Sequence, residues 1–259
     1  MKKLALCIGI NDFPGTGNDL AGCVNDAQDW ENVLVKRGFD VKVLTDKQAT
    51  RSSILQIMTE LLTITDKGDS IIITNSTHGT QIPDNNGDEA DGFDEAICVI
   101  GDDQSKIDLI TDDELWKLFK LKKPGVQLVW IADSCHSGTV TRAVGEVYSG
   151  KRRFLPLWTL IKYLINNPVS GKREASFEGE EWPCLLLAGC QDNEYCYDDY
   201  FETRPNGAFT KTAIEALSKL PMQTTYSDWF RAIKRVLPST RHPQTPNIIG
   251  SYLNAQILS

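Results

Sequence analysis

The chain has 259 residues, of which 41% are hydrophobic, and it carries a formal net charge of −8 with a pI near 5.0. This length allows a sizeable core, and we expect one domain rather than two. The acidic balance argues against nucleic acid or an anionic membrane as the main partner, because binding phosphate groups requires a basic surface. An acidic protein suits a cationic ligand instead.

The first apolar segment, Leu4–Ile10, is too short for a signal segment and is predicted to be a strand. No long apolar region preceded by a charged one opens the chain, so we expect a cytoplasmic protein. The seven cysteines are odd in number and scattered through apolar segments, which is typical of reduced thiols rather than a disulfide framework.

Apolar, β-branched runs alternate with segments of helical spacing. Strands are predicted at Leu4–Ile10, Val41–Leu44, Ser70–Thr74, Gln127–Ala132 and Cys184–Ala188. Helices are predicted at Leu20–Lys36, Thr50–Ile64, Asp112–Lys120, Ala208–Leu220 and Asp228–Leu237. This order indicates an α/β fold with an open, mostly parallel sheet. Right-handed crossovers would then bring the ends of the third and fourth strands to the same edge.

Three stretches interrupt this alternation. Asp84–Asp103 is rich in glycine, asparagine and acidic residues, and we expect an exposed hairpin that contains the strand-like Ala96–Ile100. Thr139–Glu181 resembles a linker. After the last predicted helix, three prolines indicate extended chain.

Two of the predicted strands end in residues that can carry out chemistry. The third runs into Asn75-Ser76-Thr77-His78-Gly79, and the fourth runs into Asp133-Ser134-Cys135-His136-Ser137-Gly138. A histidine next to a cysteine at the carboxyl edge of a sheet forms a base and a nucleophile. A cysteine paired in this way attacks a carbonyl carbon, and the histidine then protonates the leaving amine. The pattern predicts amide-bond cleavage through a thioester.

The alternation of side chains in an extended segment decides which of these residues face one another. Cys135 and Asp133 point the same way, as do His78 and Ser76, whereas His136 points away from Cys135. His78 is therefore the predicted base. The backbone N–H groups of Gly79 and Cys135 are candidates for an oxyanion hole.

Each residue also has an ordinary structural interpretation. A lone Cys135 would be a small buried hydrophobe, and a lone His78 would be a loop histidine. Their occurrence together at two matching strand ends favours the catalytic interpretation. The other cysteines lack paired Cys-x-x-Cys spacing, so the sequence predicts no zinc site.

The two strand-end motifs resemble those of metacaspases and their prokaryotic relatives, the orthocaspases. The separation of 57 residues (135 − 78) between histidine and cysteine also resembles the caspase pattern. Further segments look like motifs of this family, and they span nearly the whole chain in order: Leu20–Ala27, Asp91–Ala96, Thr111–Leu115, Leu187–Asp192, Gly207–Thr210 and Gln244–Pro246.

The resemblance implies a three-layer α/β/α caspase-like fold and one peptidase domain over residues 1–259. Its large-subunit-like part would cover about 1–140, its linker or insertion about 140–181, and its small-subunit-like part about 182–259. It further implies a cysteine endopeptidase that acts on proteins or peptides after Arg or Lys. The expected protein is a monomer without a membrane or nucleic-acid partner. By carry-over, Asp26 and Ser76 join Asp133 in the pocket for the basic side chain, the S1 site.

The resemblance also raises the question of calcium. Many metacaspases bind it through four aspartates, three of which match Asp94, Asp112 and Asp113 here. The fourth position is Arg142, a cation that opposes a divalent ion. We therefore expect that no cofactor is required, with calcium binding by the three aspartates as the alternative. A solvated acidic hairpin is a further interpretation of this region.

Basic residues in the predicted linker match the specificity that the resemblance implies. Self-cleavage in this segment is therefore a hypothesis, and an ordinary solvated basic loop is the competing interpretation. The candidate residues are Arg142, Lys151, Arg152, Arg153, Lys172 and Arg173. Two rival functions stay open. One is a catalytically silent caspase-like scaffold that binds basic peptides, and the other is a related peptidase of different specificity.

Overall fold

The structure is a computed structural model that describes residues 1–83, 92–135, 150–161, 165, 182–191 and 193–259. A six-stranded sheet forms its centre, with the strands in the order β12-β9-β7-β3-β1-β2. The bounds are β1 (Lys3–Gly9), β2 (Asp40–Thr45), β3 (Ser70–Ser76), β7 (Gln127–Asp133), β9 (Leu185–Ala188) and β12 (Asn247–Ile249). All neighbours are parallel except β12, which runs antiparallel to β9. The predicted α/β fold with a mostly parallel sheet is confirmed.

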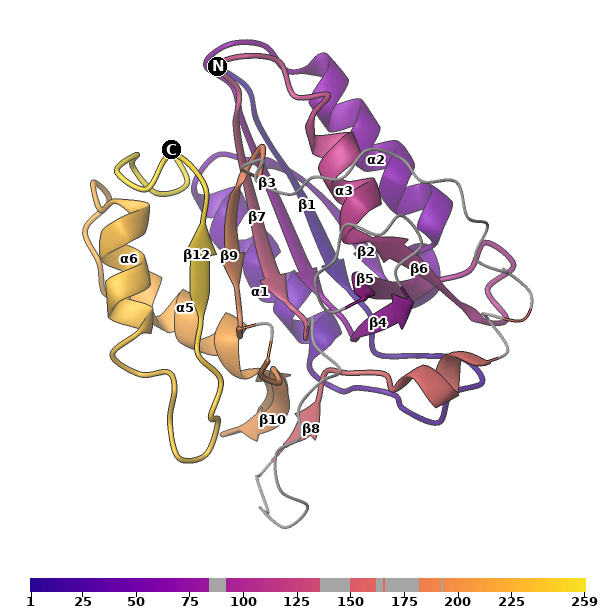
Figure 1. The fold of residues 1–259 in the computed structure, drawn as a ribbon. Helices are drawn as coiled ribbons and strands as arrows, with labels where there is room; N and C mark the ends of the chain where they lie inside the picture. Colours follow the sequence, from indigo (N-terminus) through magenta and orange to yellow (C-terminus); the bar gives the residue numbers. More distant parts are fainter. Residues whose placement is uncertain (84–91, 136–149, 162–164, 166–181, 192) are drawn as a thin grey trace.

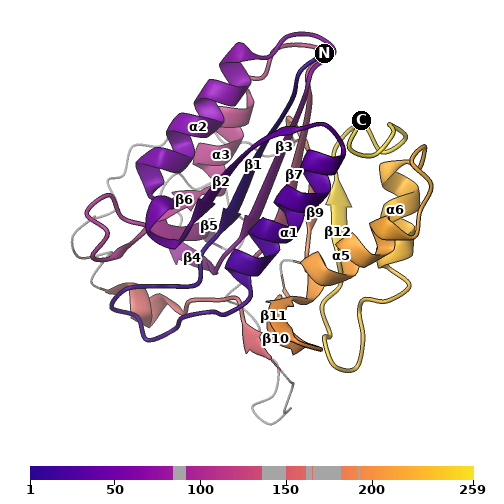
Figure 2. The same cartoon turned by 180° about the vertical axis from the view of Figure 1, so that it is seen from behind.

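Helices cover both faces of this sheet, as Figures 1 and 2 show from opposite sides. Their bounds are α1 (Cys23–Lys36), α2 (Arg51–Ile64), α3 (Asp112–Phe119), α5 (Ala208–Ser218) and α6 (Tyr226–Ile233). One face of the sheet packs with α2 and α3, and the other with α1, α5 and α6. Alternation along β1 explains the two cores, because Leu6 and Ile8 belong to the first and Ala5 and Cys7 to the second.

The five predicted helices lie within a few residues of the observed ones. Thr50 caps α2 by accepting a hydrogen bond from the backbone N–H of Ser53, at 3.2 Å. Thr111 and Glu114 form a capping box at the start of α3. No helix in the described part of the chain is long and apolar enough to cross a membrane.

A small antiparallel sheet replaces the exposed hairpin expected in residues 84–103. It consists of β4 (Gly79–Pro83), β5 (Phe93–Ile100) and β6 (Ile107–Thr111). Residues 96–100 are at most 2% exposed and belong to the core beside α2 and α3. The expectation of an exposed segment was wrong for this strand, because its consecutive apolar residues are buried on both faces. The acidic residues around it in the sequence did not indicate this burial.

Part of the predicted linker is built into the fold. Lys151–Arg152 forms β8, which joins β10 (Tyr197–Phe201) and β11 (Arg204–Gly207) in a third sheet. Two short 3-10 helices, η1 (Asp46–Gln48) and η2 (Leu157–Leu160), complete the described elements. Leu155 and Leu160 have no exposed surface. This segment is therefore anchored by apolar side chains rather than solvated.

Candidate active site

The candidate site lies where β3 and β7 end side by side. These strands are parallel and in register, so that Ser76 lies opposite Asp133. Two residues later along each strand come His78 and Cys135, which are 1% and 0% exposed. The structure thus brings both predicted reactive residues to the same sheet edge.

His78 has a defined tautomer. Its Nε2 lies 2.7 Å from the carbonyl oxygen of Asn18, which can only accept, so Nε2 carries the proton. Nδ1 is then the basic nitrogen, and it is buried without a hydrogen-bond partner among the described residues. Burial lowers the pKa of His78 to about 4, although the bond to Asn18 and the charge of Cys135 act in the opposite direction. Phe13 packs edge-on against the ring, at 4.6 Å between centroids.

The thiol of Cys135 is polarised by its neighbours. Burial alone would raise its pKa, but hydrogen bonds from the side chains of Cys190 and Cys196 lower it well below the usual range for a thiol. The backbone N–H of Cys196, 2.8 Å from Sγ, and His78 act in the same direction. These contacts favour the thiolate, the nucleophilic form of cysteine, once the thiol proton has passed to a base.

Two backbone donors converge beside this thiol. The N–H groups of Gly79 and Cys135 both donate to the carbonyl oxygen of Arg153, at 3.0 and 3.3 Å. These are the two N–H groups predicted for the oxyanion hole. Two donors on one carbonyl polarise it towards attack by the neighbouring sulfur.

The side chain of Arg153 is fully buried in an acidic pocket. Nη2 donates to Asp26 at 2.6 Å and to Asp198 at 2.9 Å, while Nη1 lies 3.1 Å from Asp133. Nη1 also donates to the hydroxyl of Ser76 at 3.3 Å. All three residues predicted for the basic pocket, Asp26, Ser76 and Asp133, therefore meet around one guanidinium.

Burial makes this pocket electrostatically demanding. It raises the pKa of Asp26 to about 6 and also raises the pKa of Asp133, although Arg153 opposes both shifts. Desolvated carboxylates without a nearby cation would be costly, so the pocket strongly favours a basic group. The N–H of Gly207 and the side chain of Asn206 also donate to Asp26 and hold it in place.

Asp198 belongs to this pocket and was missed by sequence reasoning. It lies on β10 next to Asp199, and the two carboxylates resemble a solvated strand face in the sequence. Alternation along the strand places them on opposite sides: Asp198 contacts Arg153, whereas Asp199 contacts Arg241 and His242. The pair of acids in a strand-like segment was the available signal, but nothing local indicated what it faced.

Residues 151–155 run through the site, beginning with the short strand β8. Residues 151 and 152 pair antiparallel with β10, and the N–H of Arg153 donates to the carbonyl of Cys196 at 3.0 Å. On the other side, Leu155 donates to the carbonyl of Gly79 at 2.9 Å and accepts from the hydroxyl of Thr80 at 2.7 Å. This is strand addition to an open edge, a common way of binding a peptide.

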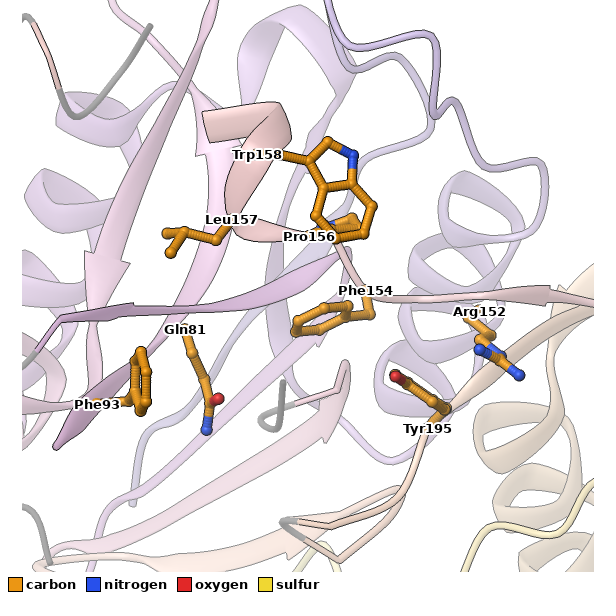
Figure 3. Close-up of a pocket in the computed structure, with 8 residues that line it drawn as sticks. All are labelled: Gln81, Phe93, Arg152, Phe154, Pro156, Leu157, Trp158 and Tyr195. Carbon is orange, nitrogen blue, oxygen red and sulfur yellow. The ribbon is translucent and has the colours of Figure 1, made fainter. Parts of the chain in front are cut away.

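A cavity of about 500 Å³ lies beside this strand (Figure 3). Phe154 packs against Tyr195 with 5.7 Å between ring centroids, and the guanidinium of Arg152 lies 4.5 Å from the same ring. The cavity is lined by Gln81, Phe93, Arg152, Phe154, Pro156, Leu157, Trp158 and Tyr195. Tyr195 thus contacts the residues on both sides of Arg153.

The three aspartates considered for calcium lie at β5 and α3. Asp94 is on β5, and Asp112 and Asp113 open α3, which follows the neighbouring strand β6. Asp113 also lies 3.9 Å from Lys117. Within the described ranges, the three do not form a group whose ligand atoms all lie close together. His136, Arg142, Lys172 and Arg173 lie outside the described residues.

Known proteins resemble this chain over its whole length. The family model described as the caspase domain matches residues 2–257. Metacaspase-1 of Cryptococcus neoformans var. neoformans is 31% identical over 97% of this chain and 63% of its own length. Metacaspase-7 of Arabidopsis thaliana is 40% identical over 53% of this chain and 35% of its own length. A crystal structure from Geobacter sulfurreducens covers 100% of this chain and 99% of its own, with a TM-score of 0.80 and 29% identity. The chain spans less than two thirds of the Cryptococcus relative.

Proposed function

The chain belongs to the caspase-domain family and has metacaspase homologues, and from this premise we propose an endopeptidase that cleaves after Arg or Lys. The family is one of cysteine peptidases, so the substrates are proteins or peptides. The observation that carries the specificity is Arg153. Its guanidinium lies among three carboxylates while its carbonyl oxygen accepts from Gly79 and Cys135. A substrate residue at P1, the residue before the cleaved bond, would bind in the same way.

The proposed mechanism uses Cys135 as the nucleophile. Its thiolate attacks the P1 carbonyl carbon, and the developing oxyanion is held by the N–H groups of Gly79 and Cys135. A proton taken from the thiol by Nδ1 of His78 passes to the leaving amine as the C–N bond breaks. Because burial lowers the pKa of His78 to about 4, its imidazolium readily gives this proton to the leaving amine. Water, deprotonated by His78, then hydrolyses the thioester and releases the carboxylate.

We propose self-cleavage at the bond between Arg153 and Phe154. Of the three self-processing candidates that the structure describes, Arg153 is the one whose carbonyl group lies beside the oxyanion donors. Lys151 and Arg152 are exposed and contribute backbone pairing or ring contacts instead. The uncut segment also covers Cys135, so it limits access of other substrates until it is cut or displaced.

Two assays test these proposals. Fluorogenic peptides with Arg, Lys or Asp at P1 are expected to be cut after Arg or Lys only, and not by the Cys135→Ala variant. Mass spectrometry of the purified chain is expected to detect a cut after Arg153. Arg153→Gln should abolish that cut, whereas the matched Arg152→Gln should keep it. Binding of Arg peptides without any hydrolysis would support the silent scaffold instead, and preferred cleavage after Asp would overturn the pocket assignment.

A further inference from the structure

Two cysteines that do not themselves react in the proposed mechanism lie beside the nucleophile. The Sγ atoms of Cys135, Cys190 and Cys196 all lie within 4.8 Å of one another. Within the described ranges they are the only group of three or more potential metal ligands that converge in this way. Each of the three residues is at most 1% exposed. The cluster is therefore an unusual concentration of soft ligands in a buried place.

The fold holds these sulfurs from three directions. Cys135 follows β7, Cys190 follows the adjacent parallel strand β9, and Cys196 precedes β10. Strands β7 and β9 stay connected at this end, because the N–H of Gly189 donates to the carbonyl of Ala132 at 2.8 Å. Two of the sulfurs therefore come from the segment between β9 and β10, and the third comes from the end of the adjacent strand β7.

The thiols of Cys190 and Cys196 contact each other and also donate to the same backbone carbonyl. Cys196 Sγ lies 3.0 Å from Cys190 Sγ. Both donate to the carbonyl of Ser134, at 3.3 and 3.8 Å. Cys135 Sγ accepts from the backbone N–H of Cys196 at 2.8 Å and lies 3.6 Å from the carbonyl oxygen of the same residue. Three cysteine sulfurs held this close together are a ready precursor of a three-sulfur ligand set.

The spacing suits one tetrahedral cation. A Zn–S bond of about 2.3 Å corresponds to sulfurs about 3.8 Å apart, so separations below 4.8 Å require only small shifts. Thiolates select zinc, cadmium or copper(I) over hard ions such as calcium or magnesium. Three protein ligands leave the fourth position for water, as in open zinc sites.

We propose that Cys135, Cys190 and Cys196 bind one thiophilic d10 cation such as Zn²⁺, and that the bound cation reversibly inhibits the peptidase. The cation replaces the thiol protons of the three cysteines, so one M²⁺ binds three thiolate sulfurs and three protons leave to the solvent. Nothing is oxidised. The inhibition rests on the proposed function, whereas the binding does not. Sequence spacing predicted no zinc site, because the three ligands come together only in the folded chain.

Cadmium provides a readout that does not depend on catalysis. Titration of the reduced full chain with Cd²⁺ alone is expected to give one equivalent bound, with thiolate-to-cadmium charge-transfer absorption that corresponds to three Cd–S bonds. Cys190→Ala and Cys196→Ala should each lose one bond and weaken binding by at least about tenfold. The matched control is Cys184→Ala, which removes another buried thiol outside the cluster and should change neither quantity. Thermal unfolding of each variant confirms that it is folded.

Because the backbone of Arg153 is hydrogen-bonded to Cys135 and Cys196, the titration is repeated on Arg153→Gln, which loses the buried ion pairs that anchor this segment. The proposal is overturned if neither protein binds Cd²⁺ through three sulfurs, or if binding in the two cluster variants equals that of the control. Discovery of a disulfide among the three cysteines by mass spectrometry of the air-exposed protein, without cation binding, would also overturn it.

The inhibition is tested separately with Zn²⁺ and an Arg peptide. The rate is expected to fall on addition of Zn²⁺ and to return with a chelator. The concentration that halves each variant's own metal-free rate should rise at least about tenfold in Cys190→Ala but not in Cys184→Ala. Three Cd–S bonds in a chain that hydrolyses no peptide would contradict the proposed function alone, whereas a peptidase without the bonds would contradict this inference alone.

Discussion

Asp26 accepts a hydrogen bond from Arg153 over 2.6 Å, and both side chains are fully buried although they are 127 residues apart in the chain. This pair lies at the base of a pocket whose other acids are Asp133 and Asp198. Under the proposed function, the protein's own arginine occupies the place of a substrate side chain. It indicates which groups should govern the binding of basic residues.

Asp198 should contribute to specificity as strongly as the residues expected from the sequence. We predict that Asp198→Asn lowers kcat/KM for peptides with Arg at P1 by roughly 30-fold to several thousand-fold. This range corresponds to about 2–5 kcal/mol for loss of one partner of a buried charge pair. Asp199→Asn is the matched control, because its side chain contacts Arg241 and His242 instead. Equal losses in both variants would contradict a direct role for Asp198.

The acid side of the pH profile should follow Asp26 rather than His78. Burial raises the pKa of Asp26 to about 6, so this carboxylate becomes neutral below that pH and attracts the P1 cation less. We predict that KM for Arg peptides rises as the pH falls through about 6, while His78, with a pKa of about 4, remains a competent base. Asp26→Asn should raise KM at neutral pH and remove this dependence. A KM that is flat from pH 5 to 7 in the wild type would contradict the assignment.

The same shift has a consequence for stability. Because the pKa of Asp26 is higher in the folded protein than its ordinary value of 3.8, the folded state binds more protons between about pH 4 and 6. Its contribution to stability is therefore present below pH 4 and is lost as the pH rises through about 6. The Asp26→Asn variant should show a smaller decrease in the free energy of unfolding over this interval, as measured by denaturant titration.

Glycine should be required at position 207 because the pocket leaves no room for a side chain, and not because of an unusual backbone conformation. A Cβ at this position would overlap Oδ2 of Asp133 and Nη1 of Arg153, although the φ of −72° suits any residue. We predict that Gly207→Ala raises KM for Arg peptides at least about tenfold, because loss of one close contact to a charge costs more than 1.4 kcal/mol. Steady-state kinetics distinguish a rise in KM from a fall in kcat. A fall in kcat alone would contradict this prediction and indicate an effect on the nucleophile.

Arg153 should also stabilise the uncut chain. In a Cys135→Ala background, which prevents cutting, Arg153→Met leaves the buried carboxylates without their cation. We predict a loss of about 3–5 kcal/mol in the free energy of unfolding at neutral pH. Arg152→Met is the control and should cost less than about 1 kcal/mol, because the side chain of Arg152 is exposed and lies over the ring of Tyr195. Similar losses would show that the buried pairs do not dominate.

Calcium should not be required for hydrolysis. The proposed steps use only a thiolate, an imidazole and backbone donors, and Arg142 stands where an aspartate ligand would be expected. We predict equal initial rates with a calcium chelator and with added calcium, both in the wild type and in Asp112→Asn. The alternative site would be established if the chelator removed activity, added calcium restored it in the wild type, and added calcium did not restore it in Asp112→Asn.

The sequence was sufficient where the information is local. The alternation of side chains predicted that Ser76 and His78 would share a side, as would Asp133 and Cys135, and the parallel pairing of β3 and β7 brings the four together. Strand and helix positions followed from periodicity for the same reason, since each depends on a few neighbouring residues. The resemblance added Asp26, which no local pattern identified.

Only the tertiary structure decided what surrounds these residues. Arg153 was one of six basic candidates, Asp198 was unmarked, and Cys190 and Cys196 had no metal spacing in the chain. Arg153 and Asp198 are 45 residues apart, and Cys196 lies 61 residues from Cys135. Spacing along an extended strand is set by covalent geometry, so the sequence by itself predicted that His78 and Cys135 come to the same sheet edge. The pocket and the sulfur cluster depend on which distant segments pack against that strand end. That choice is made by burial of apolar side chains over the whole fold, with Leu155 and Leu160 among them.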